Sequence, residues 1–359
     1  MHFGSDNWAG AHPQILAALA QASEAGTARA YGGDEWTARV EQQLGAIFEA
    51  PCAVFLAPTG TAANGLALAA LCRPWQSVLC HEEAHINVDE CAAPEHYTGG
   101  AKIIGLPGEQ AVPDASELAA RLARWPIGQP HYAQPGALSL TQLSESGAVL
   151  DPDMIARLTE IARRYNLPTH MDGARFANAL AALDCSPAEI TWKAGVDILC
   201  LGASKGGALA CEAVIVFHPD AFPARAEALK YLRKRAGALV SKHRFLAAQM
   251  LGWLADDLWL DLAKAANAQT AKLAVEVQKA GLELAWPARG NVSFALLSAQ
   301  MASALNAAGA VFYPWPGLGP GRRRPTSQEV LARFVTSFET TDAEIAAFGA
   351  ALAIARPTL

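Results

Sequence analysis

Lys205 occupies a place in the sequence where lysine is uncommon. It follows a strongly apolar segment, Val196 to Leu201, and precedes two glycines, Gly206 and Gly207. Lysine is seldom buried without a specific task. One such task is formation of a Schiff base, which requires an amine whose pKa is lowered by burial or by a neighbouring cation. The segment therefore predicts a reactive amine, and an exposed loop lysine is the alternative that it leaves open.

Asp172 is a second residue whose position suggests chemistry. It ends a short strand-like segment, Leu167 to Met171, and lies 33 residues before Lys205. Ligands of α/β folds bind at the carboxyl ends of the strands, so a carboxylate placed there is a candidate ligand contact. An aspartate before Gly173 is also favourable helix-capping chemistry, and the segment alone leaves that alternative open.

Gly60 and Thr61 form a third candidate group. They stand between an apolar strand-like run, Cys52 to Ala57, and a helical stretch, Ala62 to Leu71. A strand, a turn of small residues and a helix together point free backbone N–H groups at an anion. Glycine lets a phosphate approach the backbone, and the threonine hydroxyl adds a hydrogen bond. On its own the pattern is equally typical of an ordinary turn.

One ligand would use all three of these groups, each of which lies at the end of a predicted strand: an anion site, a carboxylate and an amine. Pyridoxal phosphate needs a cradle for its phosphate, for which Gly60 and Thr61 are suited, and an amine such as Lys205. It also needs an acidic partner at its pyridine nitrogen, which makes the ring an electron sink, and Asp172 suits that role. The combination is far more specific than its members.

An α/β scaffold is needed to bring these residues together, and the sequence predicts one because strand-like and helical segments alternate along most of the chain. The other predicted elements are the strands Ser77 to Glu82, Ala101 to Leu106, Ala137 to Gln142 and Ala213 to Phe217 and the helix Pro152 to Tyr165. After about Ala221, long helical segments and shorter β-like pieces take over. We expect an N-terminal arm that joins the active site (1–11), a large domain with a mostly parallel central sheet (12–240) and a smaller α+β C-terminal domain (241–359).

Composition and charge narrow the kind of partner. The net charge of −6 and the pI near 5.9 argue against nucleic acid or an anionic membrane surface and favour a small molecule. The seven cysteines are scattered without the spacing of a zinc site, so we expect no metal and a reducing cytoplasm. No segment reaches the run of about 18 apolar residues expected of a membrane span, and the N-terminus lacks an export signal. We therefore expect a cytoplasmic protein.

The chain resembles the L-threonine aldolases of the fold-type-I pyridoxal-phosphate enzymes, in particular their low-specificity bacterial branch. The matching segments span nearly the whole chain: GSDN (4–7), AYGGDEWTAR (30–39), TGTAANGLAL (59–68), AHINVDECAAPE (84–95), HMDGARFANA (170–179), SPAEITWKAGVDILCLGASKGG (186–207) and ARFVTSFETT (332–341). HMDGARF followed at this distance by Ser204-Lys205 is highly specific. The resemblance implies an aspartate-aminotransferase-like fold and a carbon–carbon lyase. Its substrates would be L-threonine, L-allo-threonine and related L-β-hydroxy-α-amino acids such as phenylserine, cleaved to glycine and an aldehyde.

By this resemblance, four residues handle the cofactor ring and the reacting bonds. Lys205 would hold the cofactor as a Schiff base, and Asp172 would pair with the pyridine nitrogen. Arg175 would reach the cofactor's phenolic oxygen or the substrate carboxylate. His85 would stack on the pyridine ring, with a purely structural histidine as the alternative.

The resemblance also assigns the phosphate. Gly60, Thr61 and Ser204 would hold it, and Lys242 would touch it from a neighbouring subunit. The basic run around Lys242 is otherwise most simply a solvated helix face. The family places its active sites at a dimer interface and pairs dimers into tetramers, so we expect a homodimer or homotetramer with shared sites.

The remaining residues implied by the resemblance face the substrate. His131 would contact the β-hydroxyl, with a solvated loop histidine as its alternative, and a histidine of near-neutral pKa suits that proton transfer. Arg333 and Ser5 would bind the substrate carboxylate, and a surface salt bridge is the alternative for Arg333. Tyr31 and Asp34 would lie at the active-site entrance near a subunit interface.

Two segments depart from the family pattern. Leu143 to Ser146 replaces a segment that is usually acid-Asn-Thr, and Gly319 to Gln328 resembles an insertion. Both bear on the substrate side, so the preferred side chain stays open. A β-eliminating lyase or a racemase on the same cofactor frame, or a non-catalytic relative that binds pyridoxal phosphate, are the alternatives to the aldolase.

Overall fold

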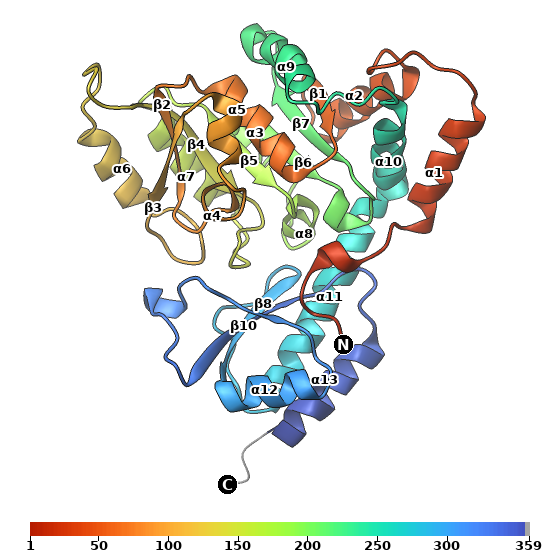
Figure 1. Ribbon diagram of the computed structural model, residues 1–359, viewed down its shortest axis with the longest axis vertical. Coiled ribbons are helices and arrows are strands. Elements are labelled where there is room, and N and C mark those ends of the chain that lie inside the picture. Colours follow the sequence, from red (N-terminus) through yellow and green to blue (C-terminus); the bar gives the residue numbers. More distant parts are fainter. Residues whose placement is uncertain (356–359) are drawn as a thin grey trace.

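The structure, a computed structural model, describes residues 1–355 and contains two sheets of unequal size (Figure 1). The large sheet has the strand order β1-β7-β6-β5-β4-β2-β3, in which β7 runs antiparallel to both of its neighbours and the other pairs are parallel. Its strands are β1 (Cys52–Ala57), β2 (Gln76–His81), β3 (Lys102–Leu106), β4 (Gln134–Thr141), β5 (Thr169–Gly173), β6 (Ile198–Gly202) and β7 (Glu212–Phe217). The expected mostly parallel central sheet is confirmed.

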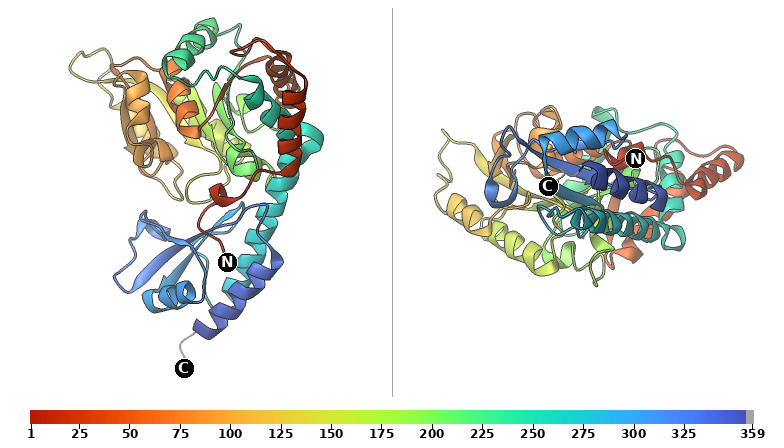
Figure 2. Two further views of the ribbon diagram at one scale, coloured as in Figure 1. Left: turned by 45° about the vertical axis from the view of Figure 1, so that its right-hand side comes forward. Right: turned by 90° about the horizontal axis from the view of Figure 1, so that it is seen from below.

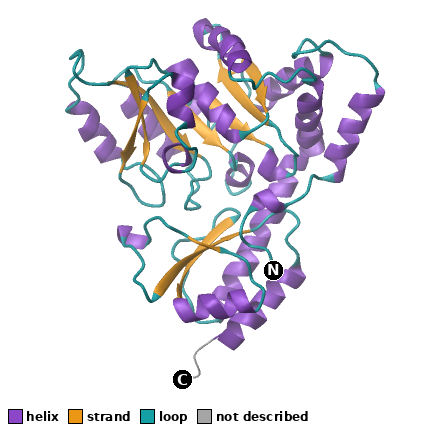
Figure 3. Ribbon diagram, viewed as in Figure 1, coloured by secondary structure: helices purple, strands orange, loops and turns teal. Residues whose placement is uncertain are grey.

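Helices cover both faces of the large sheet (Figure 3), and the strands are accordingly apolar on both sides. In β6, Leu199 and Leu201 pack into the main core, whereas Ile198 and Cys200 pack on the opposite face in the cluster that includes α3. The helices of this layer are α1 (Pro13–Glu24), α2 (Glu35–Ile47), α3 (Gly60–Leu71), α4 (His85–Val88), α5 (Ala93–Thr98), α6 (Ala115–Ala123), α7 (Pro152–Arg163), α8 (Phe176–Leu180), α9 (Pro223–Arg235) and α10 (Arg244–Leu254).

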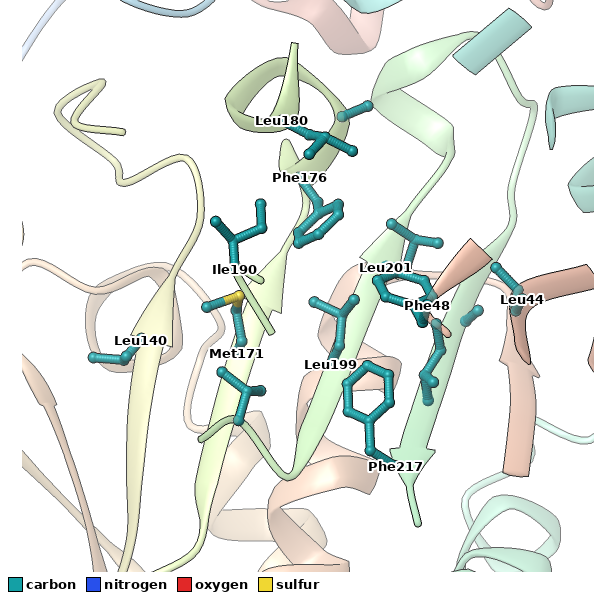
Figure 4. Packing of buried hydrophobic residues seen from close by; sticks show 14 of the residues in the cluster. Leu44, Phe48, Leu140, Met171, Phe176, Leu180, Ile190, Leu199, Leu201 and Phe217 are labelled. Atoms are coloured by element: carbon teal, nitrogen blue, oxygen red, sulfur yellow. The ribbon is translucent and has the colours of Figure 1, made fainter. Parts of the chain in front are cut away.

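Aromatic rings fill the main core where α2 and α8 meet the sheet (Figure 4). Phe48 follows α2, and the centroid of its ring lies 5.4 Å from that of Phe217 on β7 and 5.8 Å from that of Phe176 on α8. Because these rings are fully buried, each of them adds to the apolar area that stabilises the large domain.

The second sheet is antiparallel, in the order β8-β10-β9, and belongs to the smaller domain. Its elements are α11 (Leu258–Lys279), β8 (Val292–Ser298), α12 (Ala299–Ala307), β9 (Tyr313–Pro314), β10 (Glu329–Val335) and α13 (Asp342–Ala355). The N-terminal arm joins this sheet, since Phe3 accepts a hydrogen bond from the backbone of Val335 and lies in the small domain's core.

Core packing does not follow the expected division at residue 241. The apolar side chains of α10, including Met250 and Trp253, belong to the core of the large domain. Helix α11 then runs from the large domain into the small one (Figure 2). Leu262 near its start packs in the core of the large domain, and Val277 near its end packs in the core of the small domain. The division therefore falls within α11, because one amphipathic helix serves both cores.

Candidate active site

A cavity of about 390 Å³ lies where β4, β5 and β6 end, opposite the first turn of α3. These neighbouring strands are parallel, so their carboxyl ends meet at one edge of the sheet, as expected for a ligand site in this class of fold. The predicted residues that line this cavity are Gly60, Thr61, His85, Asp172, Arg175, Ser204 and Lys205.

Asp172 is buried at the end of β5 and held by two hydrogen bonds. Its Oδ1 accepts from the backbone N–H of Ala174 at 2.9 Å, and its Oδ2 accepts from Nδ2 of Asn64 at 2.8 Å. Burial alone would raise the pKa of Asp172, but the charges of His85 and Lys205 outweigh it and the pKa falls below its ordinary value. The bond to Ala174 closes a local turn and does not cap helix α8, whose N-cap is Arg175, and the carboxylate of Asp172 stays ionised in the cavity wall.

Lys205 lies in a short 3₁₀ turn, Ser204–Gly206, directly after β6. Its side chain lines the cavity, which excludes the exposed loop lysine. Burial and the positive charge of Arg175 lower the pKa of Lys205, although the carboxylates of the cavity oppose them. A lowered pKa makes the neutral, nucleophilic amine more accessible.

The first turn of α3 forms the opposite wall. Thr59 caps this helix by accepting a hydrogen bond from the N–H of Ala62 at 3.1 Å, so Gly60 and Thr61 are its first residues. A side chain at Gly60 would meet no atom within 4 Å, which means that its backbone is open on that side. Exposed N–H groups at the start of a 12-residue helix attract an anion.

His85, on α4, is tied to Asp172 through two residues that the sequence analysis did not single out. Its Nδ1 lies 2.8 Å from Oε1 of Glu90, which also accepts from Nδ2 of Asn64 at 2.9 Å. The hydrogen bond to Glu90 raises the pKa of His85, which opposes the effect of its burial. The only available signal was that both residues lie inside segments carrying the family resemblance.

Glu145 is a further cavity residue that the sequence analysis missed. Its Oε1 accepts from the backbone N–H of His85 at 2.7 Å and from Oγ1 of Thr141 at 3.0 Å, whereas its buried Oε2 has no hydrogen-bond partner. Burial raises the pKa of Glu145 to about 7. Its signal was the departure from the family pattern at Leu143 to Ser146.

Two arginines lie near each other, Arg175 of the large domain and Arg333 of the small domain. Nε and Nη2 of Arg175 donate to the two oxygens of Asp6 at 2.7 and 3.0 Å. Asp6, on the arm, was missed by the sequence analysis. Burial alone would raise the pKa of Asp6, but the charges of Arg175 and Lys205 lower it to about 2. Arg333, on β10, lies over the ring of Trp315, and its buried Nε has no hydrogen-bond partner.

Burial and the nearby charge of Arg175 lower the pKa of Arg333 to about 10, which places the two guanidinium groups in one neighbourhood. The surface salt bridge considered for Arg333 is not present among residues 1–355.

The structure does not bring His131 to the cavity. It is exposed in the loop before β4, while Thr141 at the far end of that strand lines the cavity. An eight-residue strand is about 25 Å long, so the two ends lie on opposite edges of the sheet. Within one chain His131 therefore has the surroundings of a solvated loop histidine.

Ser5, Tyr31 and Lys242 also lie outside the cavity of this chain. Ser5 accepts from the N–H of Asn7 and lines a separate surface hollow beside Trp8. Tyr31 and Lys242 are exposed close together, because the N–H of Tyr31 donates to the carbonyl of Ser241 at 3.0 Å. The carboxylate of Asp34 caps α2.

Comparison with known proteins agrees with this geometry. Residues 2–300 match the β-eliminating lyase family. The chain is 44% identical over 323 residues to a low specificity L-threonine aldolase of Pseudomonas aeruginosa, covering 89% of this chain and 91% of that protein. It is 40% identical over 345 residues to the corresponding enzyme of another Pseudomonas species, with 96% and 94% covered.

Among solved structures, that of Leishmania major threonine aldolase superposes with a TM-score of 0.87 at 25% identity, and 98% of each chain is covered. The resemblance noted in the sequence is therefore confirmed. The match extends from the arm through the cavity-forming strands to the small domain, and the chain belongs to the β-eliminating lyase family, together with the low-specificity L-threonine aldolases.

Proposed function

We propose that this protein is a pyridoxal-phosphate-dependent L-threonine aldolase, a carbon–carbon lyase that cleaves L-threonine to glycine and acetaldehyde. The observation that carries the proposal is one cavity that unites Lys205, an ionised Asp172 and the open start of α3. The 44% identity to an enzyme of that name supports the same activity.

The cavity offers a chemical group for each polar part of the cofactor. Gly60 leaves room for a phosphate beside the first turn of α3, where Thr61 and Ser204 add hydroxyl groups. Asp172 is ionised in the cavity wall and would supply the counter-charge of the pyridine nitrogen. Lys205 supplies the amine that would bond to the cofactor aldehyde, and His85 lines the same cavity and would stack on the ring.

When bound, pyridoxal phosphate takes into its ring the electron pair released by the Cα–Cβ bond of the substrate. Asp172 supports this step by keeping a proton on the pyridine nitrogen. Its carboxylate is fixed by Asn64 and Ala174, so it need not reorient during the reaction. Lys205, with its lowered pKa, holds or returns a proton on the side of the substrate Cα.

Arg333 is the better candidate for the substrate carboxylate. Arg175 already donates two hydrogen bonds to Asp6, whereas the buried Nε of Arg333 has no partner. A planar guanidinium binds a carboxylate through two parallel hydrogen bonds, which would fix the Cα–Cβ bond relative to the ring. Arg175 then shapes the cavity and leaves its positive charge near the cofactor oxygen.

Glu145 is our candidate for the base that takes the β-hydroxyl proton. Its carboxyl group lines the cavity, and Oε2 is free to accept a proton. A pKa of about 7 matches the working range of a general base. As Glu145 takes the proton, the C–O bond gains double-bond character, the Cα–Cβ bond breaks and the aldehyde leaves. This role replaces the one first assigned to His131.

The test is to incubate the purified protein with L-threonine and measure glycine and acetaldehyde, together with the visible cofactor spectrum before and after borohydride. Equal amounts of both products are expected. Release of ammonia and a keto acid would instead indicate the β-eliminating alternative. A colourless protein left unmodified at Lys205 would contradict the cofactor assignment.

We also propose that L-allo-threonine and phenylserine are substrates, because the relatives named above are described as low-specificity enzymes. The measurement is kcat/KM for each amino acid under the same conditions. A kcat/KM for L-allo-threonine within about tenfold of that for L-threonine would agree with a cavity that binds the carboxylate and the hydroxyl but discriminates little between side chains.

The protein is further proposed to act as a cytoplasmic homodimer or homotetramer with shared sites. Among residues 1–355, the cavity is lined by four acidic side chains but only two lysine or arginine side chains, so a phosphate would gain from another cation. The exposed Lys242 of a neighbouring subunit, beside Tyr31, could supply it. The tests are the mass in solution and the cofactor affinity of Lys242→Ala, which should fall without loss of assembly.

No helix within residues 1–355 is long and apolar enough to cross a membrane. Cell fractionation tests the proposed location.

A further inference from the structure

The hydroxyl of Ser204 has two polar neighbours that limit what it can do. Its Oγ accepts a hydrogen bond from the backbone N–H of Cys211 at 3.1 Å and lies 2.5 Å from Oε1 of Glu212. A serine hydroxyl has one hydrogen and can accept two. The N–H of Cys211 occupies one acceptor position, so the protonation state of Glu212 decides where the only hydrogen of Ser204 points.

Two arrangements follow. If Glu212 is ionised it can only accept, and Ser204 must donate its hydrogen to the carboxylate. Ser204 then has no hydrogen left for an anion in the cavity. If Glu212 is protonated, it donates to the second acceptor position of Ser204, whose own hydrogen is free for a phosphate oxygen.

We propose that Glu212 is a neutral, protonated acid when a phosphate group is bound in this cavity. Binding of the phosphate group then takes up one proton at Glu212, and the hydroxyl hydrogen of Ser204 turns toward the anion. The inference rests on the proposed function, which assigns the cofactor phosphate to Gly60, Thr61 and Ser204. Glu212 is a positioning residue in this scheme, because it acts through Ser204.

The surroundings of Glu212 favour a neutral acid. It is 7% exposed on β7, and a side chain at Gly202 on the adjacent strand would come within 2.9 Å of its Oε2, so water has little access. Burial, the largest influence, and the charge of Asp172 raise the pKa of Glu212 to about 7, while Lys205 and Ser204 oppose them.

The thiols of Cys200 and Cys211 also face Glu212, and burial raises the pKa of each thiol well above its ordinary value. Both thiols therefore stay neutral and add no charge. A phosphate dianion near Ser204 would raise the pKa of Glu212 further, which is the sign that the proposal requires.

The test uses inorganic sulfate, since it stays a dianion across the range and cannot itself cause a pH dependence. Sulfate binding to the cofactor-free protein is measured by calorimetry between pH 6 and pH 8. For a site that binds only with Glu212 protonated, the apparent Kd of wild type should rise about tenfold over that range. Calorimetry in two buffers of different ionisation enthalpy should show proton uptake near pH 8.

Glu212→Gln imitates the neutral acid, because its amide can donate to Ser204. It should bind sulfate at pH 8 as wild type does at pH 6, and it should lose most of the pH dependence and of the proton uptake. Glu145→Gln is the matched control: Glu145 lines the same cavity with a similarly raised pKa but makes no contact with Ser204, so its pH dependence should persist.

Ser204→Ala separates the hydroxyl from simple charge repulsion. It should bind sulfate more weakly at pH 6 and show a shallower dependence on pH. A wild-type pH dependence equal to that of Glu212→Gln would overturn the proposal, and so would a Glu212→Gln variant that binds weakly at every pH.

Failure of this inference is distinguishable from failure of the proposed function. A protein that cleaves L-threonine but shows no role for Glu212 in sulfate binding loses only the inference. A protein that binds neither sulfate nor pyridoxal phosphate loses the cofactor assignment as well.

Discussion

The two ends of the cavity are built in different ways. At the cofactor end, Asp172 and Lys205 each sit at or just after a strand of one sheet, and Gly60 begins the helix packed against it. At the proposed substrate end, next to the cavity residue Arg175, Asp6 comes from the arm and Arg333 from a strand of the other domain; these two residues lie beside the cavity and do not line it. The cofactor end is formed by one sheet and the helix packed on it. The substrate end forms only where the large domain, the arm and the small domain meet.

Hydrogen bonds show how the second end is held. Asp6 accepts from Arg175 on the large-domain side and from Nδ2 of Asn291 on the small-domain side, at 3.0 Å for the latter. The arm thus links the domains at the point where the substrate would bind. We expect changes at the cofactor end to abolish chemistry and changes at the substrate end to alter substrate affinity.

The largest effect is expected for Lys205→Ala. Loss of the amine that bonds to the cofactor should lower threonine cleavage at least about a thousandfold. The measurement is acetaldehyde release together with the visible spectrum. Lys193→Ala, which removes an exposed lysine paired with Glu49, is the control and should match wild type. Full activity in Lys205→Ala would refute the assignment of the cofactor end.

Asp172→Asn should lower kcat by roughly a hundredfold or more and change KM little. The amide keeps the shape but not the negative charge that holds a proton on the pyridine nitrogen. Steady-state kinetics with saturating cofactor provide the measurement. A defect confined to KM would place Asp172 on the substrate rather than on the ring.

Arg333→Ala should act at the other end. Loss of charged hydrogen bonds to the substrate carboxylate, worth about 1.5–3 kcal/mol, should raise KM for L-threonine roughly 10- to 100-fold and leave cofactor affinity unchanged. Arg323→Ala is the control, because Arg323 pairs with Glu329 at the surface. An unchanged KM in Arg333→Ala would remove the basis for assigning this end to the carboxylate.

The stability of the cofactor-free protein should depend on pH through Glu145. The pKa of its carboxyl is about 7 in the folded chain against an ordinary 4.5, so the folded state binds the proton more tightly. Stability should therefore fall as pH rises between those values, by at most roughly 3 kcal/mol. Urea unfolding at pH 5 and pH 8 should show a smaller decrease for Glu145→Gln than for wild type. Equal decreases would mean that Glu145 does not titrate there.

The smallest effect is expected for His131→Ala. The exposed position of His131 beyond the opposite end of β4 predicts kcat/KM within about twofold of wild type. A loss of tenfold or more would show that His131 reaches a reacting group through a neighbouring subunit, and the comparison between the two ends would then have to include the assembly.

A residue could be predicted when the pattern that marks it lies close to it in the sequence, and it was missed when its partners lie far along the chain. Asp172 and Lys205 stand beside local strand patterns, and the strand Cys52–Ala57 was placed with the bounds observed. Glu145 contacts the backbone of His85 across 60 residues, and Asp6 contacts Arg175 across 169. No local pattern reports such a contact, and both carboxylates were missed. His131, around which the resemblance is weakest, lies outside the cavity of the single chain.

The core to which α10 belongs could not be predicted for a related reason. Helix α10 begins just after the expected boundary, and its sequence is helical in either domain. Only its packing against α1 and α2 assigns it to the large core.

The sequence by itself determined the alternating α/β layer and the family, and it singled out the groups of the proposed cofactor end that line one cavity, because each depends on periodicity or on residues adjacent to one strand end. Only the tertiary structure decided that Nε of Arg333 and Oε2 of Glu145 lack hydrogen-bond partners and which end of β4 faces the cavity. Those properties depend on burial and on partners from distant segments. The direction of the Ser204 hydroxyl hydrogen also depends on the tertiary structure, since Glu212 on the neighbouring strand sets it in our proposal.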